Sequence, residues 1–491
     1  MSNYVVDRFL GMNEVLSPDL LDEKNGISCL LENADVTNGK LCGARGDEEL
    51  PCDDPVYYRH YGNENRSVVK WYGRTYWSDN FTGGCGGHEE PLGVPYPKEL
   101  PQLEALKKSG DEKGLTGDYE YCICFVNENG WESAPGEEGN YYSKITLSES
   151  WCKVTVPVFP DGIRYAKVYR TADHGADFYY VGDVETSGGT LEDKTDDITL
   201  AMLDPLESLN NYPPPEHGKY LTESGGVFFL AQGDRLYFSN SGDPHSWPRL
   251  NFIAFDADIT GILREFQGVL VFTTNDAYKV TGAENPETIV KTVIPGHPGC
   301  PNWRTMGSVA NTPLWVSNTG LCLWDGQNIT VVSRQVMRLE DVPVLFAVGT
   351  NDEYFLAVGD GVLIYDLRNG GTFRRLSVEY SFNYAWYDGD MDKIYVQRWG
   401  KLFWMKRGIR MQWHYRSGLI GTKLISHDYL ELRLNSTEGC RVRFLVDGEE
   451  RGAVNLRKGK QKVKLPFRLN GAGMQLDITG TGQLTAYAVS Y

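Results

Sequence analysis

Short runs of alternating apolar and polar residues dominate the chain, and they predict a protein built mainly of β-strands. Most runs are about five to seven residues long, rich in Val, Tyr, Trp and Phe, and bounded by Asn, Asp or Gly. The clearest helix signal is the segment 97–114, where Leu100, Leu103 and Leu106 recur at three-residue spacing before Gly110. The pattern therefore predicts a mainly β fold with one helix near residue 100.

From about residue 225 the runs repeat at a nearly constant spacing. Each unit is an apolar strand, a polar turn and a second apolar strand, with equivalent points at Phe228, Val269, Leu314, Tyr354 and Ile394. The steps are 41, 45, 40 and 40 residues, which is the spacing of β-propeller blades. We predict a propeller of five or six blades over residues 206–420. The similar stretch 66–80 is expected to join or close the ring.

A segment with a different pattern precedes these repeats. Its strand at Tyr119–Phe125 alternates, Asn129 and Gly130 form a turn, and the strands YAKVYRT and YYVGDV follow. These features resemble a fibronectin type III or related immunoglobulin-like sandwich. We expect residues 111–205 to be such an insertion, followed by the proline-rich connector NNYPPPEHGKY.

The last region, 421–491, alternates cleanly over several strands and predicts a small antiparallel β-sandwich with a strongly cationic outer face. Residues 1–110 are expected to be N-terminal strands and loops that join the propeller. Basic residues of the C-terminal sandwich are the candidate contacts to a partner: Arg451, Arg457, Lys458, Lys460, Lys462 and Lys464.

Charge is distributed unevenly along the 491 residues, whose 48 basic and 66 acidic side chains give a net charge of −18. Residues 1–140 hold 26 acidic and 12 basic side chains, whereas residues 398–468 hold 6 and 17. Either the two regions contact different neighbours or other copies of the chain, or both are solvated surfaces. The acidic balance argues against tight wrapping of nucleic acid.

Composition places the chain among soluble globular proteins. No apolar run approaches the ~18 residues of a membrane span, and the N-terminus has no secretory signal pattern, so we expect synthesis in the cytoplasm. The ten cysteines are scattered without a CxxC pair and are expected to be reduced and buried, with Cys122 and Cys124 on one strand face.

Motifs for catalysis or metal binding are missing from the sequence. The eight histidines are isolated, no GxSxG or P-loop motif occurs, and the glycine-rich stretch 82–90 is expected to be a loop. Acidic pairs at Asp53-Asp54, Glu89-Glu90 and Asp196-Asp197 are more simply solvated loop residues than calcium ligands or glycosidase carboxylates. We therefore expect no catalytic, cofactor or metal site and no enzymatic activity.

Two phrases resemble structural proteins of tailed bacteriophages. The first, YFSNSGDPHSW, includes Asn240, Gly242, Asp243, Pro244 and Trp247. The second runs through residues 8–50, where the family's pattern G-x-L-x-x-R-x-G is matched by Gly39-Lys40-Leu41, Arg45 and Gly46, although Gly11-Met12-Asn13 stands where a double glycine is usual. The family resembled is the tail nozzle or hub protein of short-tailed phages, also called packaged-DNA stabilisation protein.

The resemblance implies a non-enzymatic, propeller-based structural protein of the virion tail, assembled in the host cytoplasm. In that family a homo-oligomeric ring, expected to be a hexamer, lies below the portal and adaptor proteins and contacts tail fibre or spike proteins. It retains the packaged double-stranded DNA and provides the channel for its ejection. A carboxylate-lined lumen would let DNA pass without specific binding.

Two alternatives belong to other classes. The first is a receptor-recognising or fibre-attaching phage tail protein that binds surface glycans through aromatic platforms at Trp71, Tyr72, Tyr76 and Trp77. The second is a propeller glycosidase that uses two of the loop carboxylates.

Overall fold

The computed structural model divides into two compact units. Unit 1 comprises 1–64, 272–277 and 294–491, and unit 2 comprises 65–271 and 278–293. The structure describes residues 3–18, 20–21, 26–51, 65–87, 91–107, 113–334, 336–337, 339, 343–368, 370–420, 425–427, 431–464, 469–471 and 473–490.

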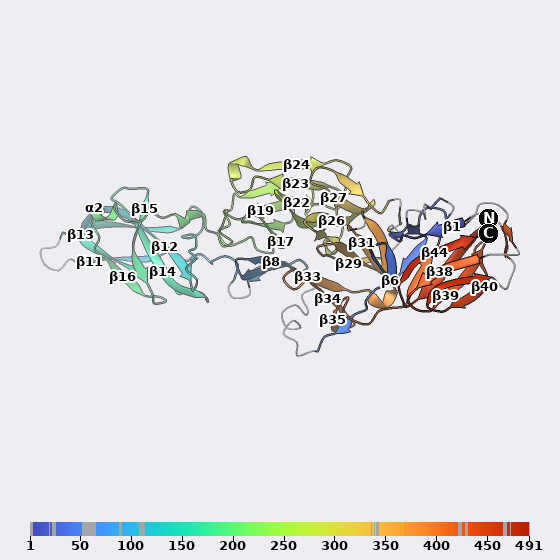
Figure 1. The fold of residues 1–491 in the computed structure, drawn as a ribbon. Helices are drawn as coiled ribbons and strands as arrows, with labels where there is room; N and C mark the ends of the chain where they lie inside the picture. The colour runs from blue at the N-terminus through green and yellow to red at the C-terminus, as the bar shows by residue number, and fades with distance from the viewer. Residues whose placement is uncertain are drawn as a thin grey trace. The chain divides into compact units, whose positions relative to one another are not determined.

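Sets of four neighbouring strands repeat along the chain and give it a mainly β, propeller-type fold (Figure 1). In four of the five described sets the strands are consecutive in sequence; the set β29–β32 is part of a larger sheet. Unit 2 holds β17 (Lys219–Ser224), β18 (Val227–Gln232), β19 (Arg235–Phe238) and β20 (Phe252–Ala254), then β21 (Gly261–Glu265), β22 (Gly268–Phe272), β23 (Ala277–Thr281) and β24 (Val290–Ile294).

Unit 1 continues the series with three more sheets. The first two are β25 (Gly307–Val309), β26 (Thr312–Ser317), β27 (Gly320–Trp324) and β28 (Ile329–Val331), then β29 (Val344–Gly349), β30 (Glu353–Val358), β31 (Gly361–Asp366) and β32 (Thr372–Leu376). The third is β33 (Tyr384–Asp388), β34 (Lys393–Arg398), β35 (Lys401–Trp404) and, from far upstream, β7 (Glu48–Glu49).

The repeat predicted from the sequence is confirmed at the level of single strands. Phe228, Val269, Leu314, Tyr354 and Ile394 all fall in the second strand of their sheets. These strands are buried on both faces, so each reads as a continuous apolar run, whereas the outer strand β24 is largely exposed.

The stretch 66–80 is a hairpin of β8 (Arg66–Trp71) and β9 (Arg74–Asp79), extended by β10 (Cys85–Gly87) into a three-stranded sheet. It packs on β17, since Ser78 Oγ accepts a hydrogen bond from Leu221 N at 2.8 Å. The hairpin is therefore part of unit 2.

The helix predicted over 97–114 is wrong, because the segment forms strand β11 (Gln102–Lys107). β11 pairs with residues 150–155 of β13 (Tyr142–Thr155) over its whole length. Leu103 and Leu106 both pack against the core beneath this sheet. Backbone pairing to an available strand thus overrides a three-residue spacing that local sequence alone would favour as helix.

The insertion consists of β11, β12 (Leu115–Asn127), β13, β14 (Ile163–Thr171), β15 (Phe178–Val184) and β16 (Thr190–Asp193), followed by the short helix α2 (Asp197–Leu200). The first part of β13 pairs with β12, and its last part pairs with both β11 and β16. All six strands therefore form one sheet, in which the long strand β13 has different neighbours along its two halves. Cys122 and Cys124 share one buried cluster with Tyr169 and Phe178, as predicted for thiols on one strand face.

The remaining strands form the C-terminal sandwich: β36 (Trp413–Arg416), β38 (Glu431–Ser436), β39 (Cys440–Val446), β40 (Glu449–Leu456), β41 (Gly459–Lys464), β43 (Met474–Gly480) and β44 (Leu484–Ser490). A separate pair is β37 (Ile425–His427) with β42 (Leu469–Gly471). The 3-10 helices are Ser208–Asn210, Pro286–Thr288, Trp303–Thr305 and Val378–Tyr380. No helix among the described residues is long and apolar enough to cross a membrane.

Strands of the N-terminal segment pair with strands of this sandwich. Its strands are β1 (Asn3–Val6), β2 (Gly11–Met12), β3 (Ile27–Ser28), β4 (Leu30–Glu32), β5 (Ala34–Thr37) and β6 (Lys40–Gly43). One sheet has the order β41-β38-β44-β6-β5 with β1 also on β44, and the other runs from β32 through β4, β36, β43 and β39 to β40. The chain termini are therefore neighbours in one sheet (Figure 1).

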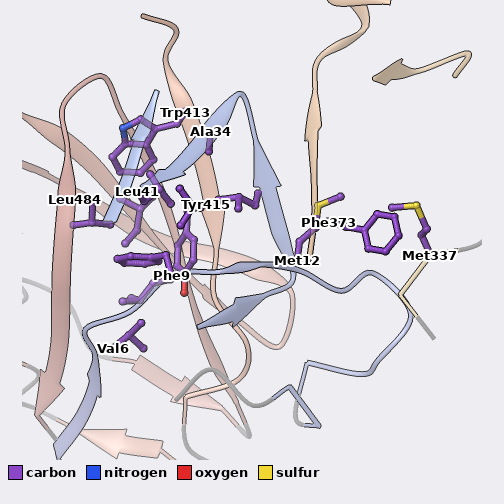
Figure 2. Packing of buried hydrophobic residues seen from close by; sticks show 14 of the residues in the cluster. Val6, Phe9, Met12, Ala34, Leu41, Met337, Phe373, Trp413, Tyr415 and Leu484 are labelled. Carbon is purple, nitrogen blue, oxygen red and sulfur yellow. The ribbon is translucent and has the colours of Figure 1, made fainter. Parts of the chain in front are cut away.

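Phe9 lies in the core between the N-terminal segment and the sandwich, beside Leu41, Trp413, Tyr415 and Leu484 (Figure 2). Its ring meets Tyr415 edge-on at 5.3 Å between centroids, a favourable aromatic geometry. The side chain is 1% exposed, so the N-terminal segment supplies core volume as well as strands.

Acidic residues of the same segment form ion pairs with basic residues of later strands. Asp47 pairs with Arg398, Glu49 with Lys401 at 2.8 Å, and Asp35 with Arg374 at 3.6 Å. Part of the charge asymmetry seen in the sequence is therefore compensated within the chain itself.

Arg374 also contacts Glu353, the central carboxylate of a buried network. Glu353 is 1% exposed and pairs with Arg374, Lys406 and, at 2.6 Å, Arg368. Burial by itself would raise the pKa of Glu353, but the three cations outweigh it and lower this pKa to about 2.

Replacing Phe9 by Ala is expected to lower the free energy of unfolding of unit 1 by about 3–5 kcal/mol, because it leaves a cavity between the N-terminal segment and the sandwich. Denaturant unfolding measures the change. The control is Phe81→Ala, whose side chain is 72% exposed and should change stability little. Equal losses in both variants would contradict the central place of Phe9.

Acid should selectively weaken the Glu353 network. Because the folded-state pKa is depressed, the stabilisation is complete above pH ~4.5 and is lost as the pH falls towards about 2. Glu353→Gln should therefore lower the melting temperature at pH 7 and flatten its decline between pH 4.5 and 2. Exposed Glu99→Gln serves as the control. Parallel melting curves for wild type and Glu353→Gln across this range would refute the assignment.

Candidate functional site

The phrase Ser239–Trp247 forms a closed loop after β19. Asn240 N donates to Ser246 O at 2.9 Å, and Trp247 Nε1 donates to Pro244 O at 2.8 Å. Asp243 Oδ1 accepts from His245 N at 2.8 Å, and burial raises the pKa of Asp243. Gly242 occupies the left-handed region at φ +77°. These phrase residues therefore define the conformation of the loop.

The same loop joins distant segments of unit 2 through His245. This ring is 2% exposed; its Nδ1 accepts from Gly93 N at 3.0 Å, and its Nε2 lies 3.4 Å from the Tyr76 hydroxyl. The Trp131 ring of the insertion lies 4.7 Å away between centroids.

Two further bonds tie the loop to the connector after the insertion. Ser246 Oγ donates to Asn211 Oδ1 at 2.7 Å, and Trp247 N donates to Tyr212 O at 2.9 Å. The loop thus holds together the β8–β9 hairpin, the insertion and the blade-like sheets of unit 2, and we call it the joint loop.

A hollow of about 590 Å³ opens beside the joint loop. Three turns surround it: the β8–β9 turn, the β17–β18 turn and the start of the joint loop. The lining residues are Lys70, Trp71, Tyr72, Glu223, Gly225, Gly226, Ser241 and Gly242.

The β8–β9 turn presents the aromatic side of the hollow. Tyr72 and Gly73 both have positive φ, at +44° and +79°, as in a type I′ hairpin turn where Asn-Gly is usual. A tyrosine there is strained, and its side chain is 87% exposed. Its ring meets Trp71 edge-on at 4.6 Å between centroids, and Trp71 packs in turn on buried Phe228 at 5.6 Å.

Polar groups face this aromatic pair. Glu223 Oε1 accepts from Gly226 N at 2.8 Å, and its Oε2 lies 3.3 Å from Arg264 Nη1. Lys70 and Ser241 are exposed at the rim. The hollow therefore offers an aromatic surface, a fixed carboxylate, an ammonium group and a hydroxyl within one site.

Of the four aromatic residues predicted to form platforms, Trp71 and Tyr72 line this hollow. Tyr76 does not, because it is 1% exposed and packs on Phe228 and His245. Trp77 is covered by the Arg66 guanidinium at 3.9 Å from its ring. The sequence analysis did not predict Glu223 or Ser241 as site residues. The sequence signal at Glu223 is the double glycine of the β17–β18 turn, and Ser241 belongs to the motif YFSNSGDPHSW.

The predicted basic contact residues lie on two consecutive strands of the C-terminal sandwich, which belong to different sheets, and in the turn between them. Arg451 lies on β40, Arg457 and Lys458 in the following turn, and Lys460, Lys462 and Lys464 at alternate positions of β41. β40 and β41 are the terminal strands of the two sheets. No described carboxylate pairs with Arg457 or Lys458, which are both exposed, so we call β40, β41 and the turn between them the basic edge of the sandwich.

Other cations of the sandwich are held by a buried carboxylate. Asp477 accepts from Arg443 at 2.6 Å and Arg416 at 2.8 Å, and it lies 2.9 Å from His414 Nε2. These partners overcome the effect of burial and lower the pKa of Asp477. Arg416 and Arg443 are therefore fixed within the sheet, unlike Arg457 and Lys458.

The other candidate residues have structural roles or lie outside the described residues. Asp196 caps α2 by accepting from Ile198 N and Thr199 N, and Asp197 pairs with buried Arg170 at 2.8 Å. Asp53-Asp54 and Glu89-Glu90 lie outside the described residues.

The described cysteines and the potential metal-ligand side chains bear on the sequence expectations. Each cysteine that the structure describes is free, and burial raises the pKa of the Cys300 thiol to about 12, which opposes thiolate chemistry. Within the described ranges, no group of three His, Cys, Asp or Glu side chains could hold a metal ion.

Comparison with known proteins yields structural similarity only. No protein-family model and no curated protein sequence matches the chain. Similar solved structures include BamB from Moraxella catarrhalis, at 10% identity over 62% of this chain and 98% of that one, with a TM-score of 0.28. The Pan2 WD40 domain from Neurospora crassa is 5% identical over 75% of this chain and 98% of that domain, with a TM-score of 0.30. AztD from Citrobacter koseri is 9% identical over 74% of this chain and 100% of that one, with a TM-score of 0.31. Because these scores are low, the propeller-type fold rests on the repeated sheets described above.

Proposed function

We propose that this chain is a non-enzymatic structural protein of a short-tailed bacteriophage virion, the nozzle or hub of its tail. Copies of the chain form a ring, a hexamer by resemblance to that family, below the portal and adaptor proteins. The ring retains the packaged double-stranded DNA and provides the channel through which it leaves.

The observation that carries the proposal is the position of the phrase shared with that family. Asn240, Asp243, Pro244 and Trp247 lie in the joint loop, which holds three parts of unit 2 together. A resemblance located in residues that maintain the architecture supports a shared architecture rather than a shared catalytic reaction.

The roles of the charged side chains agree with a structural protein. Glu353, Asp477 and Asp197 are each paired with arginines inside a sheet or at its edge. These three carboxylates therefore have partners that fix the fold.

The basic edge of the C-terminal sandwich is the surface proposed for assembly. Several N-terminal acids already have partners within unit 1, as the Asp47–Arg398 and Glu49–Lys401 pairs illustrate. The exposed Arg457 and Lys458 are available to an acidic surface of an adaptor, a fibre or a sibling chain. Such a contact should steer association and weaken as salt rises.

Reversing the charge of Arg457, Lys458, Lys460 and Lys462 to Glu is expected to prevent ring formation or incorporation into virions. Electron microscopy of the purified chain and antibody labelling of virions measure the two outcomes. Wild-type protein should form rings with a central opening, and the label should lie at the tail tip.

The matched control reverses four exposed cations of unit 2: Lys98, Lys107, Lys113 and Arg164. It makes the same change of charge and should leave assembly intact. Normal assembly of the variant with Arg457, Lys458, Lys460 and Lys462 reversed would show that the basic edge is not part of the interface. Monomers that join virions only as peripheral appendages would overturn the nozzle proposal itself.

A further inference from the structure

The hollow beside the joint loop has the composition of a ligand site. Its volume of about 590 Å³ lies within the range of about 300–1,000 Å³ that is typical of small-molecule sites. We propose that this hollow binds a pyranose unit of a surface polysaccharide, with Tyr72 and Trp71 as the stacking surface and Glu223, Ser241 and Lys70 as its polar contacts. The inference goes beyond the structural role proposed above and does not depend on it.

Tyr72 is exposed and Trp71 is half-buried, and both are fixed in place. Tyr72 is held at φ +44° in a two-residue turn, and Trp71 is anchored on Phe228 in the core. A tyrosine held at positive φ and 87% exposed is costly to the isolated chain, and its position in the lining of the hollow points to a role in binding. Rigid aromatic side chains give contact area at low cost in conformational entropy, and the C–H face of a pyranose is an apolar surface that packs on such a ring.

The glycines keep the hollow open. A Cβ atom on Gly242 would meet no atom within 4 Å, and one on Gly226 would come within 4.0 Å of Ser241 Oγ and 3.6 Å of Gly242 N. Side chains at these positions would therefore occupy the hollow itself. All three lining glycines have positive φ, so the conformation that forms the hollow also favours residues without side chains.

The polar groups match the hydroxyl pattern of a sugar. Glu223 is held by Gly226 N and Arg264, so its carboxylate is positioned before a ligand arrives and can accept from sugar hydroxyls. The Ser241 hydroxyl both donates and accepts, and the Lys70 ammonium donates. A carboxylate beside the stacking surface disfavours nucleotides, because their phosphates would be repelled, as does the net charge of −18.

The test is binding of the full-length chain to a panel of fluorescently labelled bacterial surface polysaccharides, measured by anisotropy. Wild-type protein should bind at least one probe saturably. Tyr72→Asn should lower the affinity for that probe at least 10-fold, because it removes the ring while Asn suits the type I′ turn. Tyr72→Phe should retain affinity within about three-fold, since the stacking surface remains.

The matched control is Trp399→Asn. Trp399 is also an exposed aromatic residue with positive φ, at 72% exposure and +51°, in the turn between β34 and β35. This variant should bind as wild type does, and equal melting temperatures should show that Tyr72→Asn is folded.

Three results would overturn the inference: binding to no polysaccharide of the panel, wild-type affinity in Tyr72→Asn, or displacement of every polysaccharide probe by a single-stranded oligonucleotide. Assembly is measured separately by microscopy. Loss of sugar binding with intact rings is therefore distinguishable from failure of the nozzle proposal.

Discussion

The pairing of the first fifty residues with the end of the chain is the constraint on which unit 1 depends. β1 and β6 complete a sheet with β44, β4 links β32 to β36, and β7 is the fourth strand of the β33–β35 sheet. These contacts are maximally separated in sequence, so their loop-closure entropy must be offset by burial of residues such as Phe9. Unit 1 therefore depends on pairing between its N-terminal strands and strands from much later in the sequence.

Electrostatics reinforces this pairing and changes the interpretation of the charge asymmetry. Asp35, Asp47 and Glu49 meet Arg374, Arg398 and Lys401 within unit 1, so acidic and basic regions are partly each other's partners. A smaller cationic surface is the basic edge of the C-terminal sandwich, where Arg457 and Lys458 are exposed. We therefore expect recognition of a partner by charge at that edge rather than over whole regions of the chain.

Unit 2 depends on the joint loop in a comparable way. Buried His245 and Trp247 connect the hairpin, the insertion and the blade-like sheets, while Ser241 and Gly242, only a few residues earlier, line the open hollow. One short loop thus combines an architectural role with a surface role. The strain at Tyr72 is tolerated because the β8–β9 hairpin is held on β17 by separate contacts.

The sequence by itself determined the repeat, because strands buried on both faces, such as β18, β22 and β30, must be apolar throughout. It also predicted that Cys122 and Cys124 lie on one strand face, and it placed the candidate basic residues in the C-terminal sandwich. It failed at β11, where pairing with β13 overrode local periodicity, and at Tyr76, which is aromatic but buried. Only the tertiary structure decided which distant residues meet: the N-terminal strands with β44, and Trp71 and Tyr72 with Glu223 and Ser241. Strand order and the convergence of turns are set by long-range packing, which leaves no periodic signal in the local sequence.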